Sequence, residues 1–168
     1  MASHHHDRDD LTGEHRLGDA GQLILALLFA LVWLTDSFLL HWTTFLNREI
    51  AVFLRVPLGT FLLMLSTYLA WTSIRIVFGE VREQPAVIRQ GVFNLVRHPM
   101  YLSEILLYLG LLLLSLSLAA TFVWLLAIIF LHFISRHEEK LLLERFGNEY
   151  ARYLHEVPMW IPGWHRSG

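Results

Sequence analysis

Four apolar runs, each close to the length of a helix that crosses a membrane, constrain this chain more than any other feature. They cover roughly residues 21–40, 57–78, 101–116 and 119–134. A bilayer core about 30 Å thick needs about 20 apolar residues in a helix. Lipid offers no partner for open backbone groups, so such runs must cross it as helices or in a closed barrel. The pattern predicts an all-α polytopic membrane protein of about four transmembrane helices.

Composition supports a single domain that has lipid as its solvent. Of the 168 residues, 55% are hydrophobic and only 17% are charged, against about 45–50% apolar residues in an ordinary soluble domain. The formal net charge of -2 gives no basic surface of the kind that binds nucleic acid. The absence of cysteine excludes disulfides, thiolate catalysis and thiolate metal sites. We therefore expect one membrane domain over residues 21–168 and no nucleic-acid partner.

The first twenty residues differ from the rest of the chain. They are polar, they include three consecutive histidines at positions 4–6, and they lack the apolar stretch of a secretory signal. We expect residues 1–20 to form a disordered tail or to be the remnant of an expression tag. Nothing in such a tract fixes the geometry of a metal site, so we predict none there.

Arginine and lysine fall mainly on one side of the expected helices. Nine of them precede the first run, stand at the end of the second or between it and the third, or follow the fourth: Arg8, Arg16, Arg75, Arg82, Arg89, Arg97, Arg136, Lys140 and Arg145. The opposite side carries Arg48 and Arg55. The positive-inside rule then predicts that both termini face the cytoplasm, in a prokaryotic cytoplasmic membrane or the endoplasmic reticulum.

Local signals place several helix ends. Pro57 suits the first turn of the second helix. The third and fourth runs are separated only by small, uncharged residues around 115–120, which predicts a tight antiparallel hairpin. Helical spacing continues beyond the fourth run until Gly147, a good C-terminal stop. Residues 149–156 look like a short interfacial amphipathic helix, with Trp160 and Trp164 after it at headgroup level.

The first polar cluster stands where the third run begins, at residues 97–101. Pro99 suits the first position of a helix and leaves His98 at its cap. The positive end of the helix dipole would then point toward the cytoplasm, where it could accept the carboxylate of a ligand.

Tyr101, Glu104 and Tyr108 follow at spacings of three and four and form one stripe on this helix. A carboxylate on a membrane helix is costly unless it faces protein or water. Glu104 therefore either pairs with a neighbouring helix or lines a cavity, and the sequence leaves both readings open.

The second polar cluster lies at the cytoplasmic end of the fourth helix. Glu138 and Glu139 follow Arg136 there. Adjacent carboxylates on a helix point about 100° apart, so we expect at most one of them to face a site shared with the third run. Solvation and pairing within the helix would also explain these charges. His132, higher on the same helix, is more typical of an interhelical hydrogen bond than of catalysis.

Together the clusters resemble a known family of membrane enzymes. The succession is Gly91-Val92-Phe93, Arg97-His98-Pro99-Met100-Tyr101, a helical hairpin, Glu138-Glu139, Leu142, Phe146-Gly147, Glu149-Tyr150, Tyr153, Val157 and Pro162. It resembles the isoprenylcysteine carboxyl methyltransferase family, which is related to the phospholipid methyltransferases. The resemblance lies within residues 79–162 and is carried by the order and spacing of its pieces.

The resemblance implies an S-adenosylmethionine-dependent methyltransferase whose lipophilic acceptor enters from the bilayer. Its cofactor contacts would fall on Pro85, Ala86, Val87, Ile88, Phe93, His98, Pro99, Met100, Tyr101, Glu138 and Glu139. Glu138 suits an ammonium or hydroxyl donor of the cofactor, and aromatic rings suit its base or its sulfonium. An amine or alcohol acceptor would need a base, for which Glu104 and His98 are available.

Two departures leave the acceptor open. Phe93 stands where relatives often carry tyrosine, and Ile134 stands where eukaryotic members carry an arginine that faces the acceptor. Arg136 is the nearest replacement for that arginine. An isoprenylcysteine-like carboxylate, a phospholipid amine and a thiol all remain candidate acceptors.

Two rival functions are also open. Membrane sterol-type reductases, which use NADPH, carry a pattern like Pro99, Tyr101 and Glu104, and a non-catalytic membrane module could retain the same fold. The paired carboxylates at 138 and 139 and the run 146–150 fit the methyltransferase pattern better. Binding of S-adenosylhomocysteine, of NADPH or of neither would separate the three functions.

Overall fold

The computed structural model describes residues 16–79 and 85–163, and in these ranges the chain forms helices and their connections without any strand. The elements are α1 (Arg16–Leu34), the π-helical turn η2 (Thr35–Leu40), the 3-10 turn η3 (Phe45–Arg48), α2 (Val52–Phe78), the 3-10 turn η4 (Gly91–Asn94), α3 (Pro99–Ser115), α4 (Leu118–Phe146) and α5 (Asn148–Glu156). The histidines at 4–6, Arg8, Arg82 and Trp164 lie outside the described residues.

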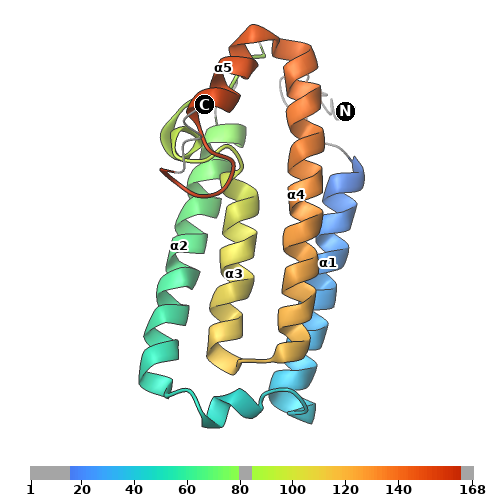
Figure 1. The fold of residues 1–168 in the computed structure, drawn as a ribbon, viewed down its shortest axis with the longest axis vertical. Helices are drawn as coiled ribbons and strands as arrows, with labels where there is room; N and C mark the ends of the chain where they lie inside the picture. Colours follow the sequence, from blue (N-terminus) through green and yellow to red (C-terminus); the bar gives the residue numbers. More distant parts are fainter. Residues whose placement is uncertain (1–15, 80–84, 164–168) are drawn as a thin grey trace, which may run out of the picture.

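Four long helices stand side by side, with α2 along α3 and α4 along α1 (Figure 1). The α1–α2 and α3–α4 connections lie at one end of the bundle. The start of α1, the start of α3, the end of α4 and all of α5 lie at the other, which we call the site end (Figure 1). Only Leu116 and Ser117 separate α3 from α4, so the expected tight hairpin is confirmed.

The expected all-α membrane architecture is confirmed. Three helical segments are long and apolar enough to cross a bilayer: Ala20–Leu40, Val52–Phe78 and Leu118–Phe146. Their large apolar side chains are widely exposed, as in Leu31, Phe53 and Phe133, which suits a lipid environment. The fourth expected span is the shorter apolar helix α3, whose 17 residues extend about 25 Å at 1.5 Å per residue.

Helix ends agree with the sequence at α4 and differ at α1 and α2. Helix α4 continues to Phe146, and Gly147 ends it with a positive φ of 52°, a conformation that costs glycine little. Helix α1 begins at Arg16, inside the segment expected to be a disordered tail. Pro57 is not in the first turn of α2, because the helix begins five residues earlier at Val52. The expected position of Pro57 was wrong.

Small residues bring α2 and α3 close together. Gly59 and Gly110 face each other so closely that a β-carbon at Gly110 would lie 2.9 Å from Leu63 and 3.1 Å from the carbonyl oxygen of Gly59. Nearer the site end, the Ser66 hydroxyl donates to the carbonyl oxygen of Ser103 at 2.7 Å. Close backbone approach through small residues is a common way to join helices in a membrane. It fixes α3 against α2.

Polar groups fasten the opposite end of the bundle. The buried carboxylate of Asp36 accepts the hydroxyls of Thr43 and Ser117, each at 2.5 Å. The Arg55 guanidinium donates to the carbonyl oxygen of Leu114 at 2.7 Å. These contacts tie the two connections at this end to each other and hold α3 against α2.

We expect Gly110→Val to lower the free energy of unfolding by about 1–3 kcal/mol, because the added methyl groups must push α3 away from α2. Thermal unfolding of the purified protein in detergent measures the change. Ala20→Val, at an exposed position of α1, is the matched control and should be nearly neutral. Equal losses in the two variants would contradict the close α2–α3 contact.

Candidate active site

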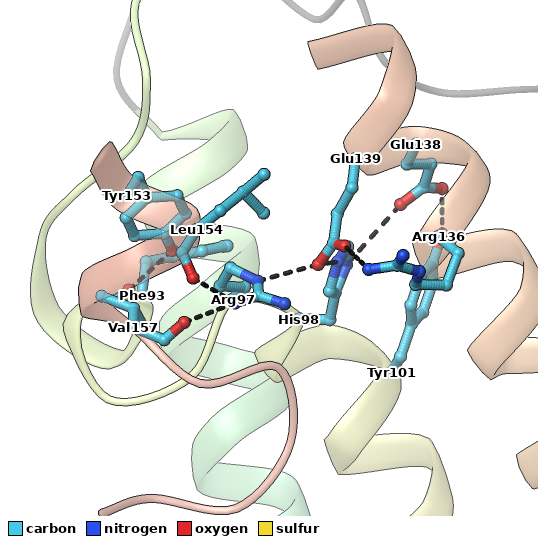
Figure 2. Close-up of polar contacts among 10 residues, drawn as sticks. All are labelled: Phe93, Arg97, His98, Tyr101, Arg136, Glu138, Glu139, Tyr153, Leu154 and Val157. Atoms are coloured by element: carbon cyan, nitrogen blue, oxygen red, sulfur yellow. Dashed lines mark hydrogen bonds and ion pairs between the residues drawn. The ribbon is translucent and has the colours of Figure 1, made fainter. Parts of the chain in front are cut away.

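The candidate site forms where α3 begins beside the end of α4. His98 is the N-cap residue of α3, Pro99 occupies the first helical turn, and both are buried. The backbone N–H of Leu102 donates to the carbonyl oxygen of His98 at 3.0 Å, which closes the first turn. The expected cap at this position is therefore confirmed, and it points His98 toward α4 (Figure 2).

A buried carboxylate of α4 joins this cap to its surroundings. Glu139 is only 3% exposed. It accepts the Arg97 Nε–H at 2.8 Å, lies 3.3 Å from His98 Nε2, and accepts an Arg136 Nη1–H at 3.3 Å (Figure 2). Two guanidinium groups therefore compensate its charge. Glu139 connects the start of α3 to α4.

Arg97 extends the same network to α5. Its Nη1 donates to the carbonyl oxygens of Leu154 at 2.9 Å and Val157 at 2.6 Å (Figure 2). Its backbone N–H donates to the carbonyl oxygen of Pro158 at 3.0 Å. The last carbonyls of a helix lack partners within the helix and carry its negative dipole end. Arg97 satisfies them, so one guanidinium holds the end of α5 against α3 and α4.

Glu138 faces the same cap from the other side of His98. The Tyr101 hydroxyl donates to Glu138 Oε1, and His98 Nδ1 lies 3.7 Å from Glu138 Oε2. The rings of His98 and Tyr101 stack almost parallel, with centroids 5.5 Å apart. The expectation that at most one of the two carboxylates faces α3 was wrong. Because they point about 100° apart, each reaches a different nitrogen of one imidazole ring that lies between them.

Burial controls the charge of His98. Its side chain is 8% exposed, and burial lowers the pKa of His98 below its usual 6.5, with Arg97 lowering it further and Glu139 acting against both. His98 is therefore more readily neutral than a histidine in water.

The segment that precedes α3 in the chain contacts α5 in space. Pro85 and Ala86 are exposed, and Val87 and Ile88 are half-buried. Val87 contacts the cluster formed by Tyr150, Tyr153 and Val157. Phe93 lies in η4, and its carbonyl oxygen accepts the Tyr153 hydroxyl at 2.7 Å. The structure thus holds Phe93 and Val87 beside α5.

Glu104 lies apart from this cluster. Its carboxylate accepts Gln22 Nε2–H from α1 at 3.2 Å and the Tyr108 hydroxyl at 2.5 Å. Glu104, Tyr108 and Met100 line a cavity of about 370 Å³ between α1, α2 and α3, which we call the inner cavity. Glu104 therefore both pairs with another helix and lines a cavity. Tyr101, the remaining residue of the stripe expected along α3, contacts Glu138 of α4 instead.

The structure brings together His98, Tyr101, Arg136, Glu138 and Glu139 among the residues selected from sequence, and it assigns new roles to two others. Arg97 was part of the recognised run but was not expected to anchor α5. Gln22 carried no signal, because a polar residue near the start of an apolar run is ordinary. Its contact with Glu104 joins residues 82 positions apart.

Stability should fall below pH 6.5 because of His98. The His98 imidazole takes up a proton near pH 6.5 in the unfolded chain, but only at lower pH in the folded chain, because its pKa is lower there. The stability that neutral His98 contributes above pH 6.5 is therefore lost as the pH falls below that value. For a single titrating group, the free energy of unfolding changes by at most about 1.4 kcal/mol per pH unit. We expect the advantage of wild type over His98→Gln in thermal midpoint to shrink below pH 6.5.

His155→Gln, at an exposed position of α5, controls for the loss of one histidine. An advantage of wild type over His98→Gln that grows as pH falls would show instead that the fold favours protonated His98.

Comparison with known proteins assigns the chain to a family. A model of the phospholipid methyltransferase family matches residues 50–149, more than half of the chain, and the match includes all of α2, α3 and α4. No curated protein and no solved structure matches the chain significantly. The relation to phospholipid methyltransferases expected from the sequence is confirmed, and the isoprenylcysteine side of that resemblance stays a prediction. The chain belongs to the phospholipid methyltransferase family.

Proposed function

We propose that this protein transfers a methyl group from S-adenosylmethionine to a lipophilic acceptor that reaches the site from the bilayer. The observation that carries the proposal is the contact of Tyr101 and His98 of α3 with Glu138 of α4 at the site end. It brings a carboxylate of α4 against two stacked rings in the first turn of α3 and against the N-terminus of that helix.

These groups match the chemistry of the cofactor. Glu138 is a charge-assisted acceptor for an ammonium or a hydroxyl group. The rings of Tyr101 and Phe93 offer faces to a cation or to a base. The start of α3 supplies the positive end of a helix dipole for a carboxylate. Glu139 is already compensated by Arg97 and Arg136, so we assign it to holding the site together.

When bound, S-adenosylmethionine supplies an electrophilic methyl group on a sulfonium. The acceptor donates an electron pair to that carbon, the carbon–sulfur bond breaks, and S-adenosylhomocysteine leaves. The contribution of the protein is then to position the two reactants and to exclude water, without a covalent intermediate. We assign binding of the donor to Glu138, His98 and Tyr101.

We assign the inner cavity to the acceptor. It is lined mostly by apolar side chains, and Glu104 lies in it beside Met100, the residue that directly precedes Tyr101. A carboxylate or thiolate acceptor attacks without base catalysis, whereas an amine loses a proton that Glu104 can take. We further propose that the site end faces the cytoplasm, since it carries the excess of arginine and lysine.

The competing functions differ in the ligand they require. An NADPH-dependent reductase would bind NADPH, and a non-catalytic module would bind neither cofactor. The family match is to methyltransferases and favours the first function. Titration of the purified full chain with S-adenosylhomocysteine and separately with NADPH discriminates the three. Binding of NADPH alone would reject the proposal.

We expect Glu138→Ala to weaken binding of S-adenosylhomocysteine by about 1.5–3 kcal/mol, because a charge-assisted hydrogen bond is lost. Isothermal titration calorimetry measures the change. Glu144→Ala, which removes an exposed carboxylate from the same helix, is the matched control. Unchanged affinity in Glu138→Ala would remove Glu138 from the cofactor site.

We expect Glu104→Gln to lower turnover while leaving the affinity for S-adenosylhomocysteine unchanged, as for a group that acts on the acceptor. Methyl transfer from labelled cofactor to membrane lipid extracts, expressed per folded molecule, measures turnover. Glu149→Gln, on the exposed side of α5, serves as control. Wild-type turnover together with a lower thermal midpoint would assign Glu104 a structural role only.

A further inference from the structure

His98 lies between two carboxylates, and each of its ring nitrogens faces one of them. Nε2 is 3.3 Å from Glu139 Oε1, and Nδ1 is 3.7 Å from Glu138 Oε2 (Figure 2). A neutral imidazole carries a single N–H, whereas the protonated ring donates from both nitrogens. Neutral His98 therefore turns a lone pair toward one carboxylate, and protonated His98 offers an N–H to each. The two protonation states differ by one positive charge between the carboxylates.

The two carboxylates differ in their surroundings. Glu139 pairs with two guanidinium groups, those of Arg97 at 2.8 Å and Arg136 at 3.3 Å. Glu138 accepts a neutral hydroxyl, that of Tyr101, and its side chain is 15% exposed against 4% for Glu139. A ligand therefore reaches Glu138 more readily. A proton on the imidazole and a ligand ammonium at Glu138 would each place a positive charge there, and like charges disfavour each other.

The groups around His98 act on its charge in opposite directions. Burial lowers the pKa of His98, the hydrogen bond and the charge of Glu139 raise it, and the charge of Arg97 lowers it. Tyr101 of α3 stacks on the ring, and Tyr150 of α5 is close enough for the charges of both carboxylates to act on it. Tyrosine is neutral in the pH range where histidine titrates, and arginine is always charged. Among these groups, His98 is the one that responds to small changes of pH below neutrality.

We propose that protonated His98 and the ammonium group of the methyl donor compete for Glu138, so that binding of the donor releases a proton from His98 to solution. This inference rests on the proposed binding of S-adenosylmethionine and adds its regulation. Without the donor, protonated His98 directs Nδ1–H toward Glu138. With the donor bound, the ammonium group takes that place and His98 is neutral. Acidification at the site end therefore lowers occupancy by the donor, because it stabilises the competing form.

Calorimetric titration of the full chain with S-adenosylhomocysteine tests the proposal. Titrations at one pH in two buffers of different ionisation enthalpy count the protons released on binding. We expect up to one proton per ligand below about pH 6.5 and none near pH 7.5. The affinity should fall with pH in the lower range by at most about tenfold per pH unit, the limit for one linked proton. No release between about pH 5 and 6.5 would overturn the proposal, as would uptake of a proton.

Methylthioadenosine separates competition at Glu138 from a general effect of binding. It keeps the base, the ribose and the sulfur atom but lacks the ammonium and carboxylate groups. We expect it to bind without releasing a proton. Equal proton release with methylthioadenosine and S-adenosylhomocysteine would contradict competition with an ammonium group.

Variants identify the titrating histidine. In His98→Gln, S-adenosylhomocysteine should bind without proton release, whereas His155→Gln, at an exposed position of α5, should behave as wild type. Proton release that persists in His98→Gln would overturn the assignment. Should His98→Gln unfold, NMR titration of the histidine rings in wild type replaces it, and S-adenosylhomocysteine should lower the pKa of one buried histidine. Unchanged pKa values would likewise overturn the proposal.

The experiment separates this inference from the proposed function. Binding of S-adenosylhomocysteine without proton release rejects the competition at Glu138 and leaves the proposed methyl transfer intact. Absence of binding at every pH rejects both.

Discussion

The buried ion pair between Arg97 and Glu139 is the interaction on which the geometry of the site depends. Both side chains are at most 10% exposed, and Nε and Oε1 lie 2.8 Å apart. Removing one partner of such a pair leaves a buried charge and typically costs about 3–5 kcal/mol. The pair fixes the start of α3 against α4, and the remaining donors of Arg97 hold the end of α5. Three elements thus meet at a single guanidinium.

The rest of the fold keeps that junction at one end of the bundle. Close contact at Gly59 and Gly110 fixes α3 along α2, and the carboxylate of Asp36 ties the two connections at the far end. Because both ends are fastened, the beginning of α3 has little freedom to move along α4. His98 can then lie between the carboxylates of Glu138 and Glu139. An apolar scaffold that is fastened at both ends is a suitable support for positioning two reactants.

The sequence predicted what local signals determine and missed what depends on distant partners. Apolar runs located the long helices, and Gly147 marked the end of α4, because both signals lie within the helix that they describe. Pro57 was misplaced because proline is also tolerated inside a helix whose start lies earlier. Helical spacing placed Glu104 on a face but could not supply Gln22, which comes from another helix. Likewise, spacing along α4 could not reveal that Glu139 is buried and paired with Arg97.

Hydrogen–deuterium exchange of the intact protein tests the central claim most directly, namely that the junction of α3 and α4 is the methyl-donor site. Saturating S-adenosylhomocysteine should slow exchange of backbone amides in residues 97–101 and 135–140. It should leave the far connection, residues 114–120, unchanged, and NADPH should protect neither region. Absence of protection at the junction with saturating S-adenosylhomocysteine, or the same protection with NADPH, would contradict the account.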